Sequence, residues 1–343
     1  LKAQGLSAIA GDLVLDEGTF ADPAPGPEWP AASQHWEEYC ALAGGFSANR
    51  GALTAVVEPR AAGQTARVAV EPASHGLAEK LSVATTSGGP VAVALEARAS
   101  GVVVRGTIPA GVERWSDSMA YPDPVELFGH ALAGALEGGG VRLEGGVRRE
   151  RGVPAGERLA VLRSALLPLL APINTESANS VADQLFLATG LAVRGAGTRA
   201  AAASATAEAL ARLGVSSAGL VQVDGSGLSR ANRVTAAQMT ALVEAVLAGP
   251  AGSAEAFVQS LALAGESGTL DDRLRDGAAR GRVRAKTGFI DGTSALSGVA
   301  HSLSGRTFVF SILVNYPSVA GLNASSWKPM QDELCERLVA VAP

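Results

Sequence analysis

Apolar and polar positions along the first part of the chain predict a β-rich region. Short runs of strand length, rich in β-branched residues and separated by turn residues, fill the stretch from 46 to 110. We expect strands at 53–58, 66–70, 90–95 and 101–106. A further strand is expected at 11–16, and residues 1–6 are typical of the end of an amphipathic helix stopped by Gly5.

Past residue 120 the apolar spacing changes to the three- and four-residue period of helices. We expect helices at 124–137, 157–170, 175–189, 199–213, 235–248, 253–263 and 325–341. Asn174-Thr175 offers an N-cap oxygen to the helix at 175–189, and Thr235 is placed to cap the helix at 235–248. A strand at 141–143 follows the three glycines that end the first of these helices.

Three more strands are expected near the C-terminal end. The strands at 282–287 and 295–300 are predicted to pair through a turn at Asp291-Gly292. The third, 307–314, is almost continuously apolar, which is typical of a buried sheet strand.

Composition and charge exclude several classes of function. Hydrophobic residues make up 47% and charged residues 18%, as in ordinary globular proteins, and the net charge of −5 provides no basic surface for nucleic acid. No run of 18 apolar residues predicts a membrane span. Cys40 and Cys335 lie far apart without C-x-x-C spacing, so we expect two unpaired thiols over a disulfide, and no metal site from them.

Three short motifs in the second half of the chain are informative through their order. They are Ser177-Ala178-Asn179, the loop Asp224-Gly225-Ser226-Gly227-Leu228-Ser229, and Lys286-Thr287-Gly288. Each alone is explained by ordinary structure: capping by Ser and Asn, a turn rich in glycine, and a solvated lysine on an edge strand. Ser-x-Asn followed roughly a hundred residues later by Lys-Thr-Gly is, however, the layout of penicillin-recognising serine acyl-transferases.

The residue types in these motifs suit the binding and cleavage of a peptide. The hydroxyl of Ser177 can relay a proton to a leaving amine, and the amide of Asn179 can hold a carbonyl group. Lys286 and Thr287 together suit a terminal carboxylate. A strand ending in Gly288 can pair with an extended peptide, because glycine lets a substrate approach the backbone.

The residue after this motif adds a main-chain donor. The N–H of Phe289 is well placed to serve an oxyanion hole, a device worth about 3–4 kcal/mol.

Four stretches resemble the D-alanyl-D-alanine carboxypeptidase/endopeptidases, which are the low-molecular-mass class C penicillin-binding proteins. They are INTESAN at 173–179, VDGSGLSR at 223–230, LAGESGTL at 263–270 and VRAKTG at 283–288. Similarity at 9–16 and 46–53 extends the resemblance over essentially the whole chain.

The resemblance implies an α+β fold of the penicillin-recognising serine acyl-transferase (β-lactamase/transpeptidase-like) type. Its antiparallel sheet is flanked by helices, and β-rich domains are inserted into it. On this template residues 1–40 are the remnant of an inserted subdomain and 41–150 are an inserted β-rich subdomain. Residues 151–343 are then the C-terminal part of the split catalytic domain.

The function that the resemblance implies is hydrolysis of D-Ala-D-Ala peptides. A serine-type carboxypeptidase/endopeptidase would act on peptidoglycan stem peptides through an acyl-enzyme, and β-lactams would acylate it as covalent inhibitors. Ser177, Asn179 and Lys286 would then be catalytic, with Thr287, Gly288 and Phe289 binding substrate. The resemblance implies no metal or organic cofactor, and the substrate places the protein in the periplasm or extracytoplasmic cell envelope.

The Ser-x-x-Lys motif that carries the nucleophile in this family precedes the other two motifs and is not found there. The sequence has this spacing at Ser325-Ser326-Trp327-Lys328, after Lys-Thr-Gly at the start of a predicted helix, where we expect no catalytic role. We expect the chain to begin inside a domain, with the nucleophile upstream. By themselves, the 343 residues are then expected to leave the substrate unhydrolysed and to fold poorly, because an apolar trough beside Ser177 and Lys286 is exposed.

Two other functions stay open on the sequence. One is a non-catalytic peptidoglycan-binding or scaffold protein on the same fold. The other is a β-lactamase or esterase, disfavoured because class C β-lactamases have Tyr-x-Asn where this chain has Ser-x-Asn, and because of the inserted β-rich part. The histidines His35, His75, His130 and His301 lack metal-ligand spacing and are interpreted as structural or surface residues.

Overall fold

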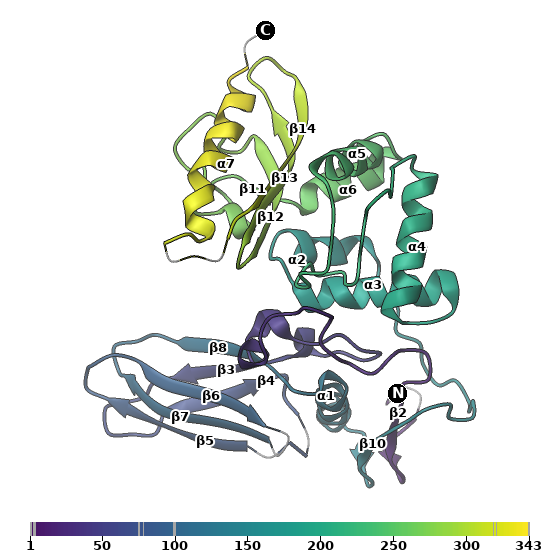
Figure 1. Ribbon diagram of the computed structural model, residues 1–343. Helices are drawn as coiled ribbons and strands as arrows, with labels where there is room; N and C mark the ends of the chain where they lie inside the picture. The colour runs from purple at the N-terminus through teal and green to yellow at the C-terminus, as the bar shows by residue number, and fades with distance from the viewer. Residues whose placement is uncertain are drawn as a thin grey trace. The chain divides into compact units, whose positions relative to one another are not determined.

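The chain folds into two compact units in a computed structural model that describes residues 2, 5–74, 76–77, 79–98, 101–317, 319 and 321–341 (Figure 1). Unit 1 comprises Leu1–Leu162 and Asp183–Ala201, and unit 2 comprises Arg163–Ala182 and Ala202–Pro343. His75 and three residues of the helix end expected at 1–6 lie outside the described residues. The division of the chain into 1–40, 41–150 and 151–343 stays a prediction.

Two three-stranded sheets make up much of unit 1 (Figure 1). The antiparallel sheet has the order β4-β3-β8, with β3 at Ala52–Glu58, β4 at Arg67–Glu71 and β8 at Trp115–Ala120. The mixed sheet has the order β5-β7-β6, with β5 at Glu79–Thr86, β6 at Ala92–Arg98 and β7 at Gly101–Pro109. Their inward residues share one core, including the fully buried Leu53, Val57 and Val104.

The first residues of unit 1 pair with residues far along the chain. β1 (Ala8–Ile9) runs parallel to β9 (Arg142–Leu143), and β2 (Leu13–Asp16) runs parallel to β10 (Val147–Glu150). Helix α1 (Pro124–Gly138) is capped by Asp123, whose Oδ1 accepts hydrogen bonds from the N–H groups of Val125 and Glu126 at 3.0 and 3.1 Å. The guanidinium of Arg149 joins these parts, since it contacts the carboxylates of both Asp123 and the buried Glu17.

Unit 2 is built on an antiparallel sheet of order β11-β12-β13-β14 (Figure 1). Its strands are β11 (Ala262–Leu263), β12 (Val283–Ile290), β13 (Thr293–His301) and β14 (Thr307–Asn315). The predicted hairpin is confirmed, because Ile290 pairs with Thr293 around Asp291-Gly292 and Gly292 has φ +83°. β14 lies at the edge of the sheet with mostly half-buried side chains, so the expectation of a buried strand holds only for Phe310.

Helices pack against this sheet. Val283 and Ala285 of β12 share a core with Cys335 and Val339 of α7 (Ala324–Val339), and α5 (Ala236–Leu247) packs on β13 and β14. The other α-helices are α2 (Leu170–Asn174), α3 (Asn179–Arg194), α4 (Arg199–Arg212) and α6 (Ala251–Ser260). Short 3₁₀ helices are η2 (Ala32–Gln34), η3 (Glu38–Cys40), η4 (Asn49–Gly51), η5 (Leu167–Leu169) and η6 (Gly268–Leu270).

Most predicted elements are found within a few residues, with three corrections among the helices. Residues 153–165 form no helix, because apolar side chains such as Leu162, 96% exposed, have no face to pack on. α3 begins at Asn179 and not at 175. α6 ends at Ser260, and 262–263 is the strand β11.

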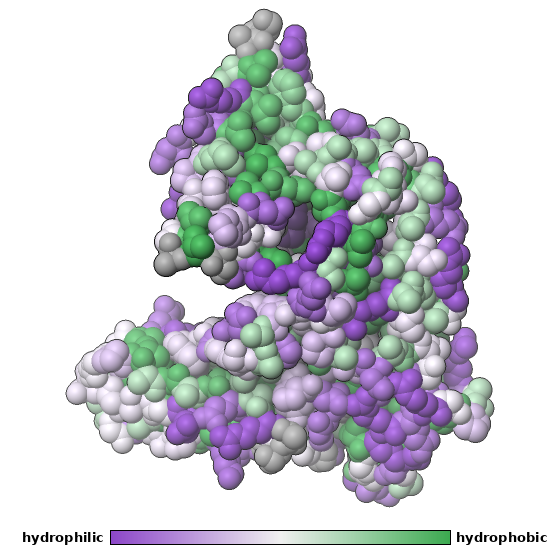
Figure 2. Space-filling model, viewed as in Figure 1, coloured by the Kyte–Doolittle hydropathy of each residue, from purple (hydrophilic) through white to green (hydrophobic). Residues whose placement is uncertain are grey.

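The surface of the described residues mixes polar and apolar side chains (Figure 2). On the visible face, the part of unit 2 formed by the sheet and α7 carries more hydrophobic residues than unit 1 does (Figure 2). No helix among the described residues has both the length and the apolar character needed to cross a bilayer.

A pair of glycine substitutions tests how tightly the unit 2 sheet is packed. A Cβ on Gly298 of β13 would overlap the carbonyl oxygen of Arg284 and the Cα of Ala285 on the neighbouring strand. We expect Gly298→Ala to lower the free energy of unfolding by about 1–3 kcal/mol. Gly252→Ala in α6 meets no atom within 4 Å and is expected to raise it by up to about 1 kcal/mol. Urea unfolding of both variants checks this, and equal effects would contradict it.

Candidate active site in unit 2

Ser177 lies in the turn between α2 and α3, with a backbone conformation that the sequence did not predict. It has φ +63°, in the left-handed region, and therefore precedes the helix; the expectation that it lies in the first turn is wrong. Asn179 is the first residue of α3 and so lies in its first turn, as expected. The side chains of Asn174 and Thr175 do not cap this helix, because Asn174 Nδ2 donates to Ser260 Oγ at 2.8 Å and the Thr175 hydroxyl donates to the Ser260 carbonyl oxygen.

Lys286 connects the first and third motifs. Its Nζ donates to Ser177 Oγ at 2.8 Å and to the carbonyl oxygen of Thr287 at 2.6 Å. Side chains alternate along β12, so Lys286 lies on the face opposite to Val283 and Ala285, which pack toward α7. The structure thus brings together Ser177 and Lys286, which the sequence placed 109 residues apart.

The environment of Lys286 disfavours the charged form of its side chain. Burial lowers the pKa of its ammonium from 10.5 to about 8, because the charged form is removed from water. No salt bridge with Lys286 occurs among the described residues, so neutral hydrogen-bond acceptors alone stabilise the charge. A half-buried cation with no anionic partner is suited to receive an anionic ligand.

β12 presents an open edge beside this lysine. It pairs with β11 only through Arg284 and Ala285, so the described strands leave that edge without a partner from Lys286 onward. Ala264 N–H donates to the Val283 carbonyl oxygen at 2.9 Å, which places the main-chain groups of Val283 on this edge. By the alternation of an antiparallel strand, those of Thr287 and Phe289 lie on the same edge. The side chain of Phe289 is 61% exposed.

Gly288 lies between these two residues and is exposed. A Cβ there would approach the Cβ of Ala295 on β13 to 3.2 Å, so the glycine also relieves crowding within the sheet. The sequence analysis predicted a role for this residue only toward a substrate.

The 263–270 stretch supplies partners that the sequence left without a role. The Thr287 hydroxyl donates to Thr269 Oγ1 at 2.8 Å, and the Thr269 N–H donates to the Thr175 carbonyl oxygen at 3.2 Å. These contacts join the turn of Ser177 to the threonine of the Lys-Thr-Gly motif. The only signal in the sequence was that residues 263–270 belonged to the resemblance.

The Asp224 motif is a tightly bonded loop in unit 2. The buried Asp224 carboxylate accepts hydrogen bonds from the N–H groups of Gly227 and Ser229 at 2.9 and 2.8 Å, and from Asn232 Nδ2 at 2.7 Å. Thr235 then caps α5 in a capping box with Gln238, as predicted. Arg230 lies 3.7 Å from the Asp291 carboxylate at the β12–β13 turn.

The Ser-x-x-Lys spacing at 325–328 lies at the start of α7. Asn323 caps this helix by accepting from the Ser325 N–H at 2.9 Å, and its own N–H donates to Ser326 Oγ at 3.2 Å. The side chains of Ser325 and Lys328 are exposed to solvent.

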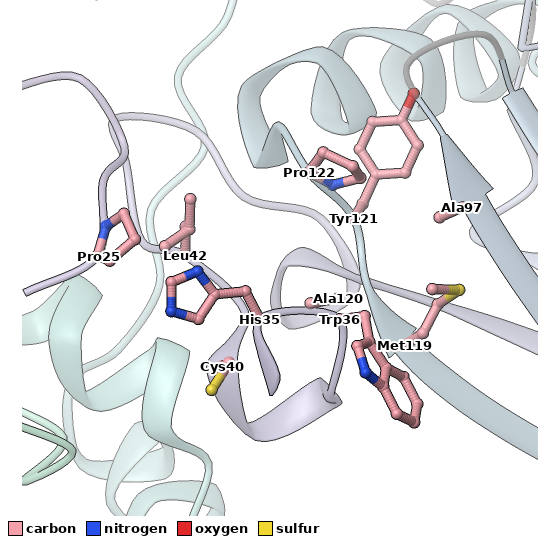
Figure 3. Close-up of a pocket in the computed structure, with 10 residues that line it drawn as sticks. All are labelled: Pro25, His35, Trp36, Cys40, Leu42, Ala97, Met119, Ala120, Tyr121 and Pro122. Carbon is pink, nitrogen blue, oxygen red and sulfur yellow. The ribbon is translucent and has the colours of Figure 1, made fainter. Parts of the chain in front are cut away.

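A separate hollow of about 390 Å³ lies in unit 1 (Figure 3). Its lining is largely apolar, and the labelled side chains come from the 25–42 stretch, β6, and the end of β8 with the two residues after it (Figure 3). His35 Nε2 lies 2.9 Å from the Pro30 carbonyl oxygen, and burial raises the pKa of the Cys40 thiol to about 11. A thiol that stays protonated at neutral pH is a poor nucleophile, so this hollow offers less chemistry than the Lys286 site.

The other cysteine is buried, and the other two described histidines make ordinary contacts. Cys40 and Cys335 are both free and buried, which confirms the prediction of unpaired thiols. His130 lies 3.8 Å from the Glu126 carboxylate, and His301 Nδ1 lies 3.0 Å from Thr307 Oγ1. Among the described residues no three His, Cys, Asp or Glu side chains gather in a group able to hold a metal ion.

The backbone conformation of Ser177 is testable by two substitutions that both remove the hydroxyl. Alanine at φ +63° carries a steric penalty that glycine does not. The left-handed conformation costs alanine about 1–2 kcal/mol, and the greater freedom of glycine in the unfolded chain offsets part of this. We therefore expect Ser177→Ala to have a lower free energy of unfolding than Ser177→Gly. Chemical unfolding of the two variants measures this difference, and an alanine variant more stable than the glycine variant would contradict it.

Comparison with known proteins identifies the family. The model of the D-Ala-D-Ala carboxypeptidase 3 (S13) family matches residues 1–335. The D-alanyl-D-alanine carboxypeptidase of Actinomadura sp. (strain R39) is 35% identical over 361 residues, which cover 100% of this chain and 65% of that protein. Carboxypeptidase DacB of Mycolicibacterium smegmatis is 33% identical over 213 residues, covering 61% of this chain and 46% of DacB. This chain thus spans less than two thirds of the length of these relatives.

A solved structure supports the fold. Penicillin binding protein 4 (dacB) from Haemophilus influenzae has a TM-score of 0.72 at 21% identity, covering 98% of this chain and 77% of that one. The same protein complexed with a β-lactam has a TM-score of 0.69. The predicted α+β fold of the penicillin-recognising serine acyl-transferases is confirmed, and the chain belongs to the D-Ala-D-Ala carboxypeptidase 3 (S13) family.

Proposed function

We propose that this chain forms the peptide-binding part of a serine-type D-Ala-D-Ala carboxypeptidase/endopeptidase that acts on peptidoglycan stem peptides and is acylated by β-lactams. The observation that carries the proposal is the half-buried ammonium of Lys286, which has only neutral acceptors and lies beside an open strand edge. An extended peptide ending in a carboxylate supplies both an anion for Lys286 and a strand for β12. The family and the fold support the same reaction class.

Each site residue then has a role that follows from its position. Lys286 and the hydroxyl of Thr287 bind the terminal carboxylate, and the main-chain N–H of Phe289 lies on the open edge where it stabilises an oxyanion. Gly288 leaves that edge accessible. Ser177, held by Lys286 at 2.8 Å, relays a proton to the departing D-alanine, while Asn179 positions the substrate carbonyl.

The nucleophile is not assigned to any residue of this chain. In the mechanism, a serine hydroxyl adds to the peptide carbonyl, the C–N bond to D-alanine breaks as the amine takes a proton, and water then hydrolyses the ester. Ser325 and Ser326 of the 325–328 sequence are exposed at the start of α7 and do not belong to the core cluster formed by the sheet and α7. We propose that the 343 residues bind the peptide without hydrolysing it.

A non-catalytic peptidoglycan-binding protein is the alternative, since it needs the same carboxylate site and no nucleophile. Peptidoglycan is outside the cytoplasmic membrane, so either function places the protein in the periplasm or extracytoplasmic envelope.

Incubation with benzylpenicillin and intact mass measurement tests the nucleophile: we expect no covalent adduct on this chain. An adduct mapped to any serine of the chain would overturn the statement that these residues do not hydrolyse the peptide.

A direct test of the site compares two peptides that differ only at the terminus. We expect acetyl-D-Ala-D-Ala to bind and its C-terminal amide to bind about tenfold or more weakly, because only the acid supplies an anion to Lys286. Lys286→Met should remove this difference, whereas Lys328→Met should retain it. Chemical-shift titration measures the affinities. Equal binding of acid and amide by the unsubstituted chain would exclude the proposed carboxylate site.

The lowered pKa of Lys286 predicts two opposite pH dependences. Carboxylate binding needs the charged form, so affinity is expected to fall as the pH rises through about 8. The unfolded chain, with a lysine pKa of 10.5, holds the proton more tightly than the native chain does. Stability relative to Lys286→Met therefore rises between pH 8 and pH 10.5. Urea unfolding across this range measures it, and a constant difference between the two proteins would contradict the prediction.

A further inference from the structure

Thr269 occupies a position where two parts of the proposed site meet. Its Oγ1 accepts the hydrogen bond of the Thr287 hydroxyl at 2.8 Å, and its N–H donates to the Thr175 carbonyl oxygen at 3.2 Å. Thr175 is two residues before Ser177. Thr269 therefore touches the residue that binds the carboxylate and the turn that presents the serine.

The backbone around Thr269 is fixed independently of its side chain. Gly268 has φ +58°, and a Cβ there would overlap the Thr175 carbonyl oxygen, so the two segments are in close contact. Leu270 is fully buried, and its carbonyl oxygen accepts the N–H of Gly265 at 2.9 Å. Because these contacts use main-chain atoms or a neighbouring side chain, changing the hydroxyl of Thr269 leaves them in place.

The hydroxyls of Thr269 and Thr287 have one proton each, which limits how this pair can bind a ligand. A hydroxyl has one proton to donate and lone pairs to accept with. In the structure the Thr287 proton is directed to Thr269, whereas a carboxylate can only accept. For Thr287 to donate to a carboxylate, its O–H must turn away from Thr269. Thr287 Oγ1 is then free to accept a hydrogen bond, and Thr269 has a proton to donate.

We propose that Thr269 is a positioning residue that reverses its hydrogen bond with Thr287 when a peptide carboxylate binds. Without ligand, Thr287 donates to Thr269; with ligand, Thr269 donates to Thr287, and Thr287 donates to the carboxylate. No proton is transferred between heavy atoms, and both hydroxyls stay bonded in each state. This inference rests on the proposed function, since it names a residue that orients the carboxylate-binding group.

Paired substitutions at Thr269 test the reversal. Thr269→Val keeps the shape but can neither accept nor donate, so the affinity for acetyl-D-Ala-D-Ala should fall about threefold to tenfold. Thr269→Ser keeps a hydroxyl and should bind within about twofold of the unsubstituted chain. Affinity for the C-terminal amide should change in neither variant. Thr307→Val, which removes an exposed threonine hydroxyl that contacts His301, serves as the matched control.

A double-mutant cycle separates positioning from general damage to the site. In a Thr287→Val background the hydroxyl pair no longer exists, so Thr269→Val should have little further effect on acid binding. Thermal unfolding of each variant identifies changes that act through stability. Equal losses for acid and amide, or additive losses in the double variant, would overturn the role of Thr269 while leaving the proposed function intact. A native chain that binds neither peptide would overturn both.

Discussion

The partial burial of one positive charge is the constraint on which the proposed site depends. The Lys286 ammonium is half-buried and stabilised by a serine hydroxyl and a carbonyl oxygen, without an acidic partner among the described salt bridges. Such an arrangement is unfavourable for an isolated protein and favourable for one that receives an anion. The surrounding structure holds the acceptors in place, with Ser177 in a left-handed backbone conformation. The edge of β12 beside Lys286 is left open.

The acceptors are held largely by backbone contacts. Thr175, two residues before Ser177, is bonded through its side chain to the Ser260 carbonyl oxygen and through its own carbonyl oxygen to Thr269. Gly268 allows the close approach, since any side chain there would overlap the Thr175 carbonyl. The stretch at 263–270 is therefore a support that connects the α2–α3 turn to the end of β12, and its residues contribute through position more than through reactivity.

The elements that the sequence predicted best are those with a periodic pattern or a specific turn. The β12–β13 hairpin with Asp291-Gly292 and the capping of α5 by Thr235 follow from short-range chemistry, and both are found. β5 and β8 were missed. β8 reads Trp-Ser-Asp-Ser-Met-Ala, and its strand conformation comes from pairing with β3, a contact that the local pattern does not contain. The prediction of a helix at 157–170 was wrong because its apolar side chains have no surface to pack on, although the local pattern is helical.

For the site, the sequence predicted which residues matter more accurately than how they are arranged. The order of Ser177, Asn179 and Lys286 along the chain indicated that they belong together, and the contact between Ser177 and Lys286 is present. The left-handed backbone of Ser177 and the role of Thr269 were not predictable, because the first depends on tertiary restraint and the second on a hydrogen bond between segments 18 residues apart.

The open edge of β12 limits which mutations can alter ligand recognition during evolution. A ligand that pairs with the N–H and C=O groups of Thr287 and Phe289 meets atoms that every amino acid except proline retains. Replacing the side chains of Thr287 and Phe289 therefore leaves this main-chain pairing available both to a substrate and to an inhibitor that imitates its backbone. Mutations that discriminate between the two must therefore arise in the side chains around the edge, where the ligands differ in shape.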